Sequence, residues 1–385
     1  MLKFNAEFYK ITAANFLFFI GFSFFILFPV FLKDIGATES FIGIMNGFDK
    51  ISIIVTAFFI GAFIAGRDRL LILRTGYVIM IIVSLLHLFI TDPTVLIALI
   101  RIAHGAGFAV ALTLVTTMIF ETVPSHRAAS AIGIFGITGA MSGAISPLAA
   151  ETLLNQGYTF DAIFILSAVS ISAALGLSFF IKIDPPDKKP DSAPAAAGIL
   201  SLIKIKRVIP IAAVTFIFGG GFGIIITFFP NFILTTTELA FSSFFLSYIT
   251  TLILVRVVLV DAFAPGSKKE LIVTAFATGS AMFFILYFLD NLPVLLLAGA
   301  MYGIAHGILY PVLNTYMVEA AGFENRERSN SLYIAMFNAG MMAFSATLGF
   351  AVDASGSYMP AFFTAGTIFI LAIIVTSVFL HNIKN

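Results

Sequence analysis

The sequence contains no cysteine, and only 11% of its 385 residues are charged. The absence of cysteine excludes disulfide bonds, iron–sulfur clusters and thiolate chemistry. Soluble domains carry about 25% charged residues, so the low charge and the 60% share of hydrophobic residues indicate a membrane protein. The net charge of +1 is divided between the loops of two sides and forms no basic patch, which gives no indication of a nucleic-acid partner.

Several motifs of catalysis and nucleotide binding are also absent. The chain has no G-x-x-x-x-G-K-[ST] loop, no H-E-x-x-H and no G-x-S-x-G. We therefore expect neither direct use of ATP nor enzymatic activity, and we expect no metal and no cofactor. The glycine-rich stretch "FGGGFG" at 218–223 lies inside an apolar run, so we interpret it as a place of tight packing or local flexibility and not as a phosphate loop.

Long apolar runs fill most of the chain. A membrane-spanning helix needs about 20 mostly apolar residues, and such runs occur near 11–32, 41–65, 70–90, 94–119, 128–154, 160–182, 208–233, 240–263, 271–289, 293–320, 329–352 and 359–381. The first run is too long for a signal peptide and lacks a small-x-small cleavage site. The sequence thus predicts an all-α membrane protein with twelve transmembrane helices.

The basic residues of the loops predict the orientation. When the loops are counted alternately, one side holds nearly all lysines and arginines and the other holds only Lys33. Because positive loops stay on the cytoplasmic side, both termini are predicted to be cytoplasmic.

The chain divides into two similar halves. The polar stretch "IDPPDKKPDSAPAAAG" at 183–198 has the composition of a flexible linker. Three short segments recur about 200 residues apart: "FPVF" at 28–31 and "FPNF" at 229–232, "AFIAG" at 62–66 and "AFAPG" at 262–266, and "IAHG" at 102–105 and 304–307. This parallel repeat predicts two pseudo-symmetric six-helix bundles, 1–183 and 208–385, joined by a cytoplasmic linker at 184–207.

The fourth apolar run resembles a signature of the major facilitator superfamily. In "RIAHGAGFA", Arg101, Gly105, Gly107 and Ala109 fall on the pattern R-x-x-x-G-x-G-x-A. The resemblance covers essentially the whole chain and implies a secondary transporter that works by alternating access, with no resident cofactor. It further implies a prokaryotic, multi-pass protein of the cell inner membrane, which we expect to be monomeric in the lipid bilayer.

The fifth run is similar to the antiporter signature of the same family. Gly133 and Pro147 match G-x8-G-x3-G-P-x2-G-G, whereas Ser142 and Ser146 replace glycines with other small residues. The loop after the second run departs further from the family, since "GAFIAGRDRLLILR" is shorter and has no aspartate five residues after Gly61. Residues of this loop and of its counterpart in the second half are candidates for gating: Gly61, Arg67, Asp68, Arg69, Arg256 and Asp261.

Ionisable groups at membrane depth are costly and usually face a cavity or a partner. Asp49 and Arg101 lie about 12 and 10 Å from the outer ends of their helices at helical rise, so they can meet, and Asn46 shares the helix face of Asp49. The pair is either a proton site or a permanent salt bridge. Lys50 is rotated by about 100° from Asp49 and is expected to point elsewhere. Glu319 is the third candidate for proton coupling, with a cap at the interface as the alternative.

Further residues are candidates for lining a substrate cavity. Both histidines of the "IAHG" repeat lie near mid-membrane, where carriers bind substrate, although a hydrogen-bonded packing role is the common alternative. His306 belongs to a helical stripe with two tyrosines and an asparagine, and the first run supplies aromatic rings. The candidates are His104, His306, Tyr302, Tyr310, Asn314, Asn46, Phe18, Phe22 and Phe25.

From these features the sequence predicts a proton-coupled exporter of a small amphipathic organic compound. A proton-coupled uptake symporter for a sugar or an organic acid, and a lipid transporter, remain open as alternatives. The expected partners are protons, the lipid bilayer and a small-molecule substrate.

Overall fold

The computed structural model describes residues 4–64, 67–124, 128–183, 195–258 and 268–380. All regular elements within these ranges are helices, and twelve of the helical segments are long and apolar enough to cross a membrane. The predicted number and class of spans are therefore confirmed. The predicted boundaries between the two bundles and the linker stay predictions.

The first six spans contain nine helical elements. The first span consists of α1, the 3₁₀ turn η1 and α2. Each of the other five spans is formed by one α-helix, and η2 extends α4. The elements are α1 (Ala6–Ser23), η1 (Phe24–Leu27), α2 (Phe28–Asp34), α3 (Glu39–Ile64), α4 (Arg69–Leu86), η2 (His87–Phe89), α5 (Leu96–Thr122), α6 (Ala128–Asn155) and α7 (Phe160–Ser178).

The second six spans follow the short helix α8 (Ala195–Leu202). Here the opening span is one uninterrupted helix, whereas its counterpart in the first half is broken by η1. The elements are α9 (Val208–Thr236), α10 (Phe241–Val258), α11 (Lys268–Ile285), η5 (Leu286–Phe288), α12 (Leu292–Ala321), η6 (Phe323–Asn325), α13 (Arg326–Ser355) and α14 (Met359–Phe379).

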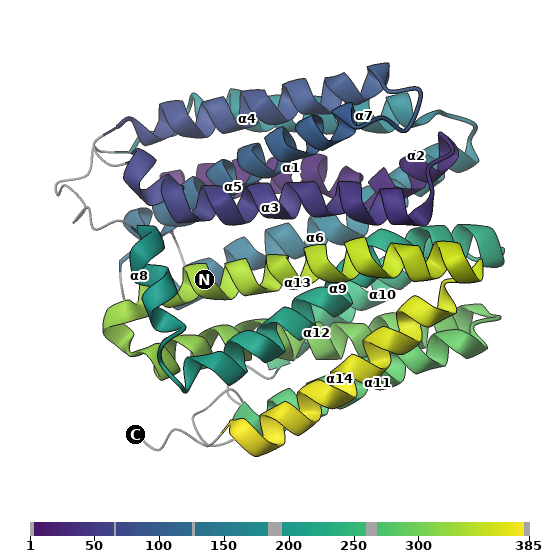
Figure 1. Cartoon of the computed structure of the whole chain (residues 1–385). Helices are drawn as coiled ribbons and strands as arrows, with labels where there is room; N and C mark the ends of the chain where they lie inside the picture. Colours follow the sequence, from purple (N-terminus) through teal and green to yellow (C-terminus); the bar gives the residue numbers. More distant parts are fainter. Residues whose placement is uncertain (1–3, 65–66, 125–127, 184–194, 259–267, 381–385) are drawn as a thin grey trace.

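The two halves lie side by side and meet along two pairs of helices. Helix α3 packs on α13, and α6 packs on α10. Figure 1 shows α1 to α7 on one side of the molecule and α9 to α14 on the other, with α8 and both ends of the drawn chain at the same end of the bundle. We call this end, which holds Ala6, α8 and Phe379, the linker end, and the opposite end, which holds the turns at 35–38 and 356–358, the far end.

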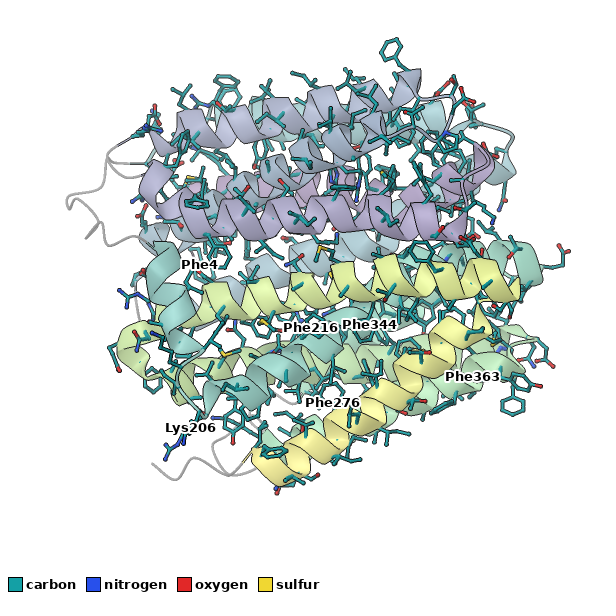
Figure 2. The ribbon with its side chains drawn as sticks, in the orientation of Figure 1. Phe4, Lys206, Phe216, Phe276, Phe344 and Phe363 are labelled. Atoms are coloured by element: carbon teal, nitrogen blue, oxygen red, sulfur yellow. The ribbon has the colours of Figure 1, made fainter. Side chains whose placement is uncertain are left out.

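Apolar side chains fill the interior and also cover the outside. The second half has one continuous core, and the first half has two smaller core clusters. On the outer faces, rings such as Phe59 and Phe363 are exposed, and Figure 2 shows Phe363 on the outward side of α14. An apolar exterior of this kind suits contact with lipid chains.

Small residues let the helices approach closely. A Cβ on Gly43 of α3 would collide with the carbonyl oxygen of Ser345 on α13, and a Cβ on Gly105 of α5 would collide with the carbonyl oxygen of Asp49 on α3. Contacts of this type are typical of membrane helices, where packing replaces the hydrophobic effect between helices. Gly105 therefore sets the spacing between the two helices that hold Asp49 and Arg101.

The run 218–223 serves the same purpose in α9. A Cβ added to Gly220 would lie 2.6 Å from the ring of Phe344 on α13. A Cβ added to Gly219 would collide with the backbone of Phe337. The ring of Phe344 in turn meets Phe216 edge-on, with 5.9 Å between centroids (Figure 2). The helix is continuous through the run, so tight packing is the structural role of these glycines.

Replacing Gly105 with alanine is expected to destabilise the protein by about 1–3 kcal/mol, because the added methyl group forces α5 away from α3. The thermal midpoint of the purified protein in detergent checks this. Gly176 of α7 is the matched control, since nothing lies within 4 Å of an added Cβ there. Gly176→Ala should leave the midpoint unchanged or raise it, and an equal loss in both variants would contradict the packing argument.

Candidate functional site

Asp49 of α3 lies at the centre of a charged cluster inside the first half. Its Oδ2 atom lies 2.7 Å from Nη2 of Arg101 on α5 and 2.8 Å from Nζ of Lys50. Asp49 is 1% exposed and Arg101 2% exposed. The predicted meeting of Asp49 and Arg101 is thus found, and one carboxylate oxygen is shared by two cations.

The position of Lys50 differs from the expectation that it would point elsewhere. The Cα–Cβ bond of Lys50 does leave the helix on a different face from that of Asp49, but the four-carbon side chain folds back and its ammonium group donates to the neighbouring carboxylate. The expectation was wrong because it considered helix faces and neglected the length and flexibility of a lysine side chain.

Three further groups surround Arg101. Its Nη1 atom lies 3.4 Å from Nδ1 of His104, its Nη2 atom donates to Oδ1 of Asn46 at 3.2 Å, and its Cζ atom sits 4.3 Å from the ring centre of Phe28. Both His104 and Asn46 were predicted to line a cavity, and the structure places them in the shell of this ion pair.

A chain of hydrogen bonds leads from this cluster into the second half. Nδ2 of Asn46 donates to the hydroxyl oxygen of Thr227 on α9 at 2.8 Å, and that hydroxyl lies 2.9 Å from the hydroxyl of Ser345 on α13. Asp49, Arg101, Asn46, Thr227 and Ser345 therefore connect four helices of both halves.

Not every polar atom of the cluster is satisfied. Oδ1 of Asp49, Nε of Arg101 and Nε2 of His104 are buried without a hydrogen-bond partner. Unsatisfied buried groups are rare in proteins and often mark functional sites. Oδ1 of Asp49 thus keeps a lone pair that no described residue uses.

The second half holds an aromatic cluster instead of a charged one. Nδ1 of His306 on α12 lies 2.7 Å from the hydroxyl oxygen of Tyr248 on α10. The imidazole also stacks on Tyr310, with 5.9 Å between centroids and 26° between planes, and it meets Phe218 and Phe222 of α9 edge-on at 5.0 Å. Of the other residues predicted for the same stripe, Tyr302 is fully buried beside His306, with 6.1 Å between centroids, whereas Asn314 bonds to Asn330 of α13.

The two repeated histidines thus have different neighbours. His104 contacts Phe22 and Phe25, with centroid distances of 5.3 and 4.4 Å, and it lies beside an ion pair. Phe18 is a core residue that packs on Tyr77 at 5.2 Å. The repeat places both imidazoles at equivalent depths, but only His104 has charged partners within 4 Å among the described residues.

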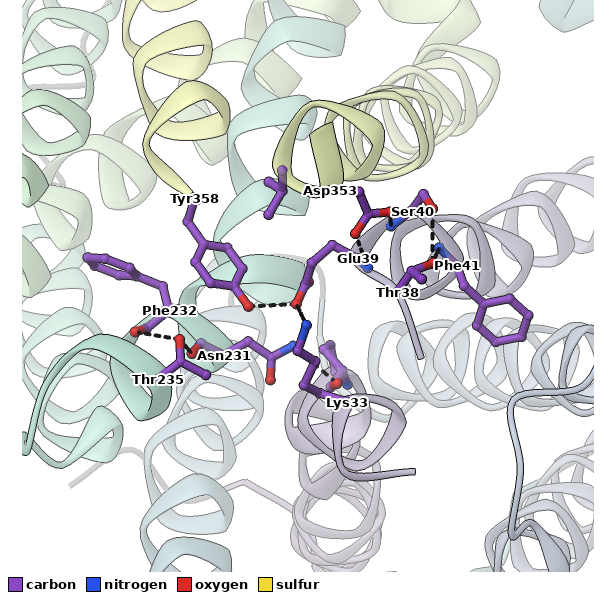
Figure 3. A network of polar contacts seen from close by, with 12 residues as sticks. Lys33, Thr38, Glu39, Ser40, Phe41, Asn231, Phe232, Thr235, Asp353 and Tyr358 are labelled. Atoms are coloured by element: carbon purple, nitrogen blue, oxygen red, sulfur yellow. Dashed lines mark hydrogen bonds and ion pairs between the residues drawn. The ribbon is translucent and has the colours of Figure 1, made fainter. Parts of the chain in front are cut away.

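A second polar network joins the two halves at the far end (Figure 3). Asp353 of α13 accepts the backbone N–H groups of Glu39 and Ser40, the first residues of α3, at 2.8 and 2.9 Å. Tyr358 donates its hydroxyl to Oε1 of Glu39 at 2.6 Å, and Nζ of Lys33 lies 2.9 Å from the same oxygen. Burial, together with the neighbouring Glu39 carboxylate, raises the pKa of Tyr358, so its hydroxyl stays protonated and keeps donating.

Glu151 of α6 repeats this arrangement between the other pair of helices. Its two carboxylate oxygens accept the backbone N–H groups of Phe241 and Ser242, the first residues of α10, at 2.9 and 3.0 Å. A carboxylate at a helix N-terminus is favourable because it satisfies free N–H groups and the helix dipole. Each half therefore caps one helix of the other half, and we call Asp353 and Glu151 the reciprocal caps.

Sequence inspection missed the reciprocal caps, although a signal for them exists. Glu151 and Asp353 are separated by 202 residues, the same displacement as the "IAHG" repeat. A search for acidic residues at the repeat displacement would have found them. Nothing comparable marks Thr227 or Ser345, because hydroxyl residues are frequent in apolar helices.

At the linker end, ion pairs form within each half. Arg69 pairs with Glu121, and Lys268 pairs with Glu319. Asp68 caps α4 by accepting the N–H of Leu70 at 2.9 Å. Glu319, predicted as a proton-coupling residue, is thus part of a salt bridge between α11 and α12, away from the Asp49 cluster.

The remaining gating candidates lie close by. The guanidinium carbon of Arg67 is 4.3 Å from the ring centre of Phe63, and Gly61 lies in the last part of α3. Arg256 is near the linker end of α10, 5.7 Å from the ring centre of Tyr310. Asp261 lies outside the described residues.

The small residues of the fifth span bind the first span. Ser142 lies 3.1 Å from the hydroxyl of Ser23, and Ser146 donates to the carbonyl oxygen of Ile20 at 2.8 Å. Pro147 lies inside α6, and no atom lies within 4 Å of a Cβ added to Gly133. The serines that replace glycine in this stretch thus hold α6 against α1.

Comparisons with known proteins agree with this architecture. A sequence profile described as Major Facilitator Superfamily matches residues 11–237 and 211–384. No match was found among curated proteins. Solved structures with a similar fold include the nucleoside transporter NupG, with a TM-score of 0.81 and 12% identity over 97% of this chain and 99% of that chain.

Two other similar structures are a POT family transporter in complex with 5-aminolevulinic acid and the human organic anion transporter MFSD10 (TETRAN). The first has a TM-score of 0.74 and 13% identity over 97% of this chain and 94% of that chain. The second has a TM-score of 0.69 and 13% identity over 97% of this chain and 100% of that chain. At these identities the likeness shows the fold.

Proposed function

Because the chain belongs to the major facilitator superfamily and is a multi-pass secondary transporter, we propose that it couples movement of a small amphipathic organic compound to protons, with Asp49 as the proton site. The observation that carries this proposal is the single carboxylate oxygen shared by Arg101 and Lys50 and linked through Asn46 to the second half. The fold excludes neither direction of transport, and export is proposed on the similarity of the fifth span to an antiporter signature.

The cluster supplies a mechanism for coupling. Protonation of Asp49 neutralises the only anion within reach of Arg101 and Lys50 among the described residues, so both cations repel each other and lose their shared partner. Arg101 then no longer holds Asn46 in place, and the bonds to Thr227 and Ser345 weaken. Proton binding thereby changes the contact between the halves, which is the contact that alternating access must rearrange.

The reciprocal caps indicate which conformation of the transport cycle this structure represents. They tie α3 to α13 and α10 to α6 at the far end. We propose that the linker end is cytoplasmic, as the distribution of lysine and arginine predicts, and that the protein works as a monomer in the inner membrane. In this orientation the far end is the outer side, and the caps hold the outer side closed.

Transport in proteoliposomes tests the proton site. A compound panel on a deletion strain, compared with growth on single carbon sources, first identifies the substrate and separates export from uptake. An imposed pH gradient should then drive accumulation by the wild type, whereas Asp49→Asn should lose the gradient response and keep substrate exchange, because the amide remains neutral at every pH.

Glu319→Gln is the informative comparison for this experiment. Since Glu319 is paired with Lys268 at the linker end, its loss should lower the rate without removing the response to the pH gradient. Accumulation that ignores the gradient in the wild type, or an unchanged gradient response in Asp49→Asn, rejects the proposed coupling.

A further inference from the structure

Hydrogen-bond donors without partners gather in the second half. The Nε atom of Arg256 on α10 and the hydroxyls of Tyr302 on α12 and Tyr333 on α13 are buried and unpaired. Both tyrosines are fully buried. Buried polar groups are nearly always hydrogen-bonded, so three unpaired donors on adjacent helices require an explanation. For Arg256, a ligand that offers acceptor oxygens would supply the missing partner.

These donors belong to one continuous cluster. The ring of Tyr310 lies 5.7 Å from the guanidinium carbon of Arg256 and 5.3 Å from the ring centre of Tyr333. His306 connects Tyr310 to Tyr302, with centroid distances of 5.9 and 6.1 Å.

Arg256 has no counter-charge among the described residues. Their ion pairs include none with Arg256. The charged cluster of the first half cannot compensate for it, because Asp49 is already shared by Arg101 and Lys50. An uncompensated cation inside a membrane protein is expensive unless a ligand or water balances it.

The surroundings of Arg256 are aromatic. Beyond the tyrosines, Phe337 of α13 lies 5.9 Å from Tyr310, and Phe222 of α9 lies 5.7 Å from Phe337, measured between ring centroids. Arg256 as a whole residue is half-buried, whereas Arg101 is 2% exposed. A cation beside several flat apolar rings fits a ligand with an acidic group on a planar apolar body.

From this combination we infer that the substrate is an organic carboxylate with an aromatic or similarly planar body, and that Arg256 binds its carboxylate. The inference rests on the proposed transport function and narrows its substrate class. The planar guanidinium holds a carboxylate by two parallel hydrogen bonds, the unpaired tyrosine hydroxyls donate to the remaining lone pairs, and the rings of Tyr310 and Phe337 contact the planar body. Substrate binding then supplies a negative charge that none of the described residues offers to Arg256.

Thermal stabilisation of the purified full-length protein by 2-naphthoate tests the inference. The neutral amide 2-naphthamide is the matched probe, because it has the same shape and lacks the charge. We expect 2-naphthoate to raise the thermal midpoint and 2-naphthamide to have little effect. Arg256→Gln should weaken 2-naphthoate binding about tenfold or more, and Arg256→Lys should retain part of the affinity.

Arg74→Gln is the matched control variant. Arg74 also lies against an aromatic ring, 4.4 Å from the centre of Phe179, but in the first half, where it donates to Ser178. The Arg74→Gln variant should bind 2-naphthoate with the same affinity as the wild type. Equal stabilisation by acid and amide, no stabilisation by the acid, or full binding by Arg256→Gln would each overturn the inference.

The outcomes separate this inference from the proposed function. Charge-dependent binding that requires Arg256, combined with transport that ignores the pH gradient, supports the carboxylate site and rejects proton coupling. Coupling that depends on Asp49, combined with equal binding of acid and amide, keeps the function and rejects the carboxylate site. The comparison of the two probes on the wild type needs no variant, so it holds even where Arg256→Gln fails to fold.

Discussion

Asp49→Leu is expected to destabilise the protein by about 3–5 kcal/mol, the cost of removing one partner of a buried ion pair, and more than Arg101→Leu does. The asymmetry follows from the geometry, because Asp49 is the shared partner of two cations. Its removal leaves Arg101 and Lys50 buried and unpaired. Removal of Arg101 leaves Lys50 with Asp49, which remains a neutral pair. The thermal midpoints of both variants in one detergent give the comparison.

The triple variant Asp49→Leu, Lys50→Met, Arg101→Leu is the control for this prediction. Replacing a whole buried ionic group with apolar residues is often neutral or stabilising, so the triple variant should recover most of the lost stability. It should remain unable to respond to a pH gradient, because the proposed proton site is gone. Equal destabilisation by the two single variants would show that Lys50 does not share the carboxylate.

The second large effect concerns the reciprocal caps. Glu151→Gln and Asp353→Asn together should shift the protein toward a state with its far end open. Each carboxylate accepts two backbone N–H groups from the other half, and hydrogen bonds to charged groups contribute about 1.5–3 kcal/mol each. A shift of about tenfold per cap therefore follows from losing even one bond. Glu151 should contribute more, since it is 6% exposed whereas Asp353 is solvent-accessible.

Spin-label distances across the far end measure this shift. The chain has no native cysteine, so Asp92→Cys and Asp290→Cys place one label on an exposed turn of each half without a background. The distance distribution should move to longer values in the double cap variant. Asp161→Asn is the matched control, because Asp161 is an exposed far-end carboxylate in the first turn of α7. An unchanged distribution in the double cap variant would show that the caps do not hold the far end closed.

The sequence predicted the fold because apolar length and the internal repeat are strong local signals. Helix depth was enough to predict that Asp49 and Arg101 meet, since equal distance from the same membrane face restricts which residues can touch. Helix-face geometry was not enough for Lys50, because its long side chain reaches a residue that lies on another face.

Other contacts required tertiary structure. The repeat displacement marks the two acids of the reciprocal caps, but the backbone N–H groups that they bind lie in the opposite half and are identified only by the docking of the halves. The link from Asn46 to Thr227 and Ser345 depends on how the halves are docked, which periodicity within one helix does not report. Arg256 was predicted as part of the gate, while its unpaired neighbours Tyr302 and Tyr333 became visible only when helices α10, α12 and α13 were seen together.

Divergence of the two duplicated units has made them non-interchangeable. At the displacement of the repeated histidines, the position equivalent to Arg101 is Gly303, and the first unit has no arginine at the positions aligned with Arg256. A gene fusion of two first units would therefore encode two charged clusters and no arginine beside the aromatic cluster, and a fusion of two second units would encode the reverse. The two halves share one helical architecture. Their buried polar residues differ, so each half supplies side chains that the other lacks.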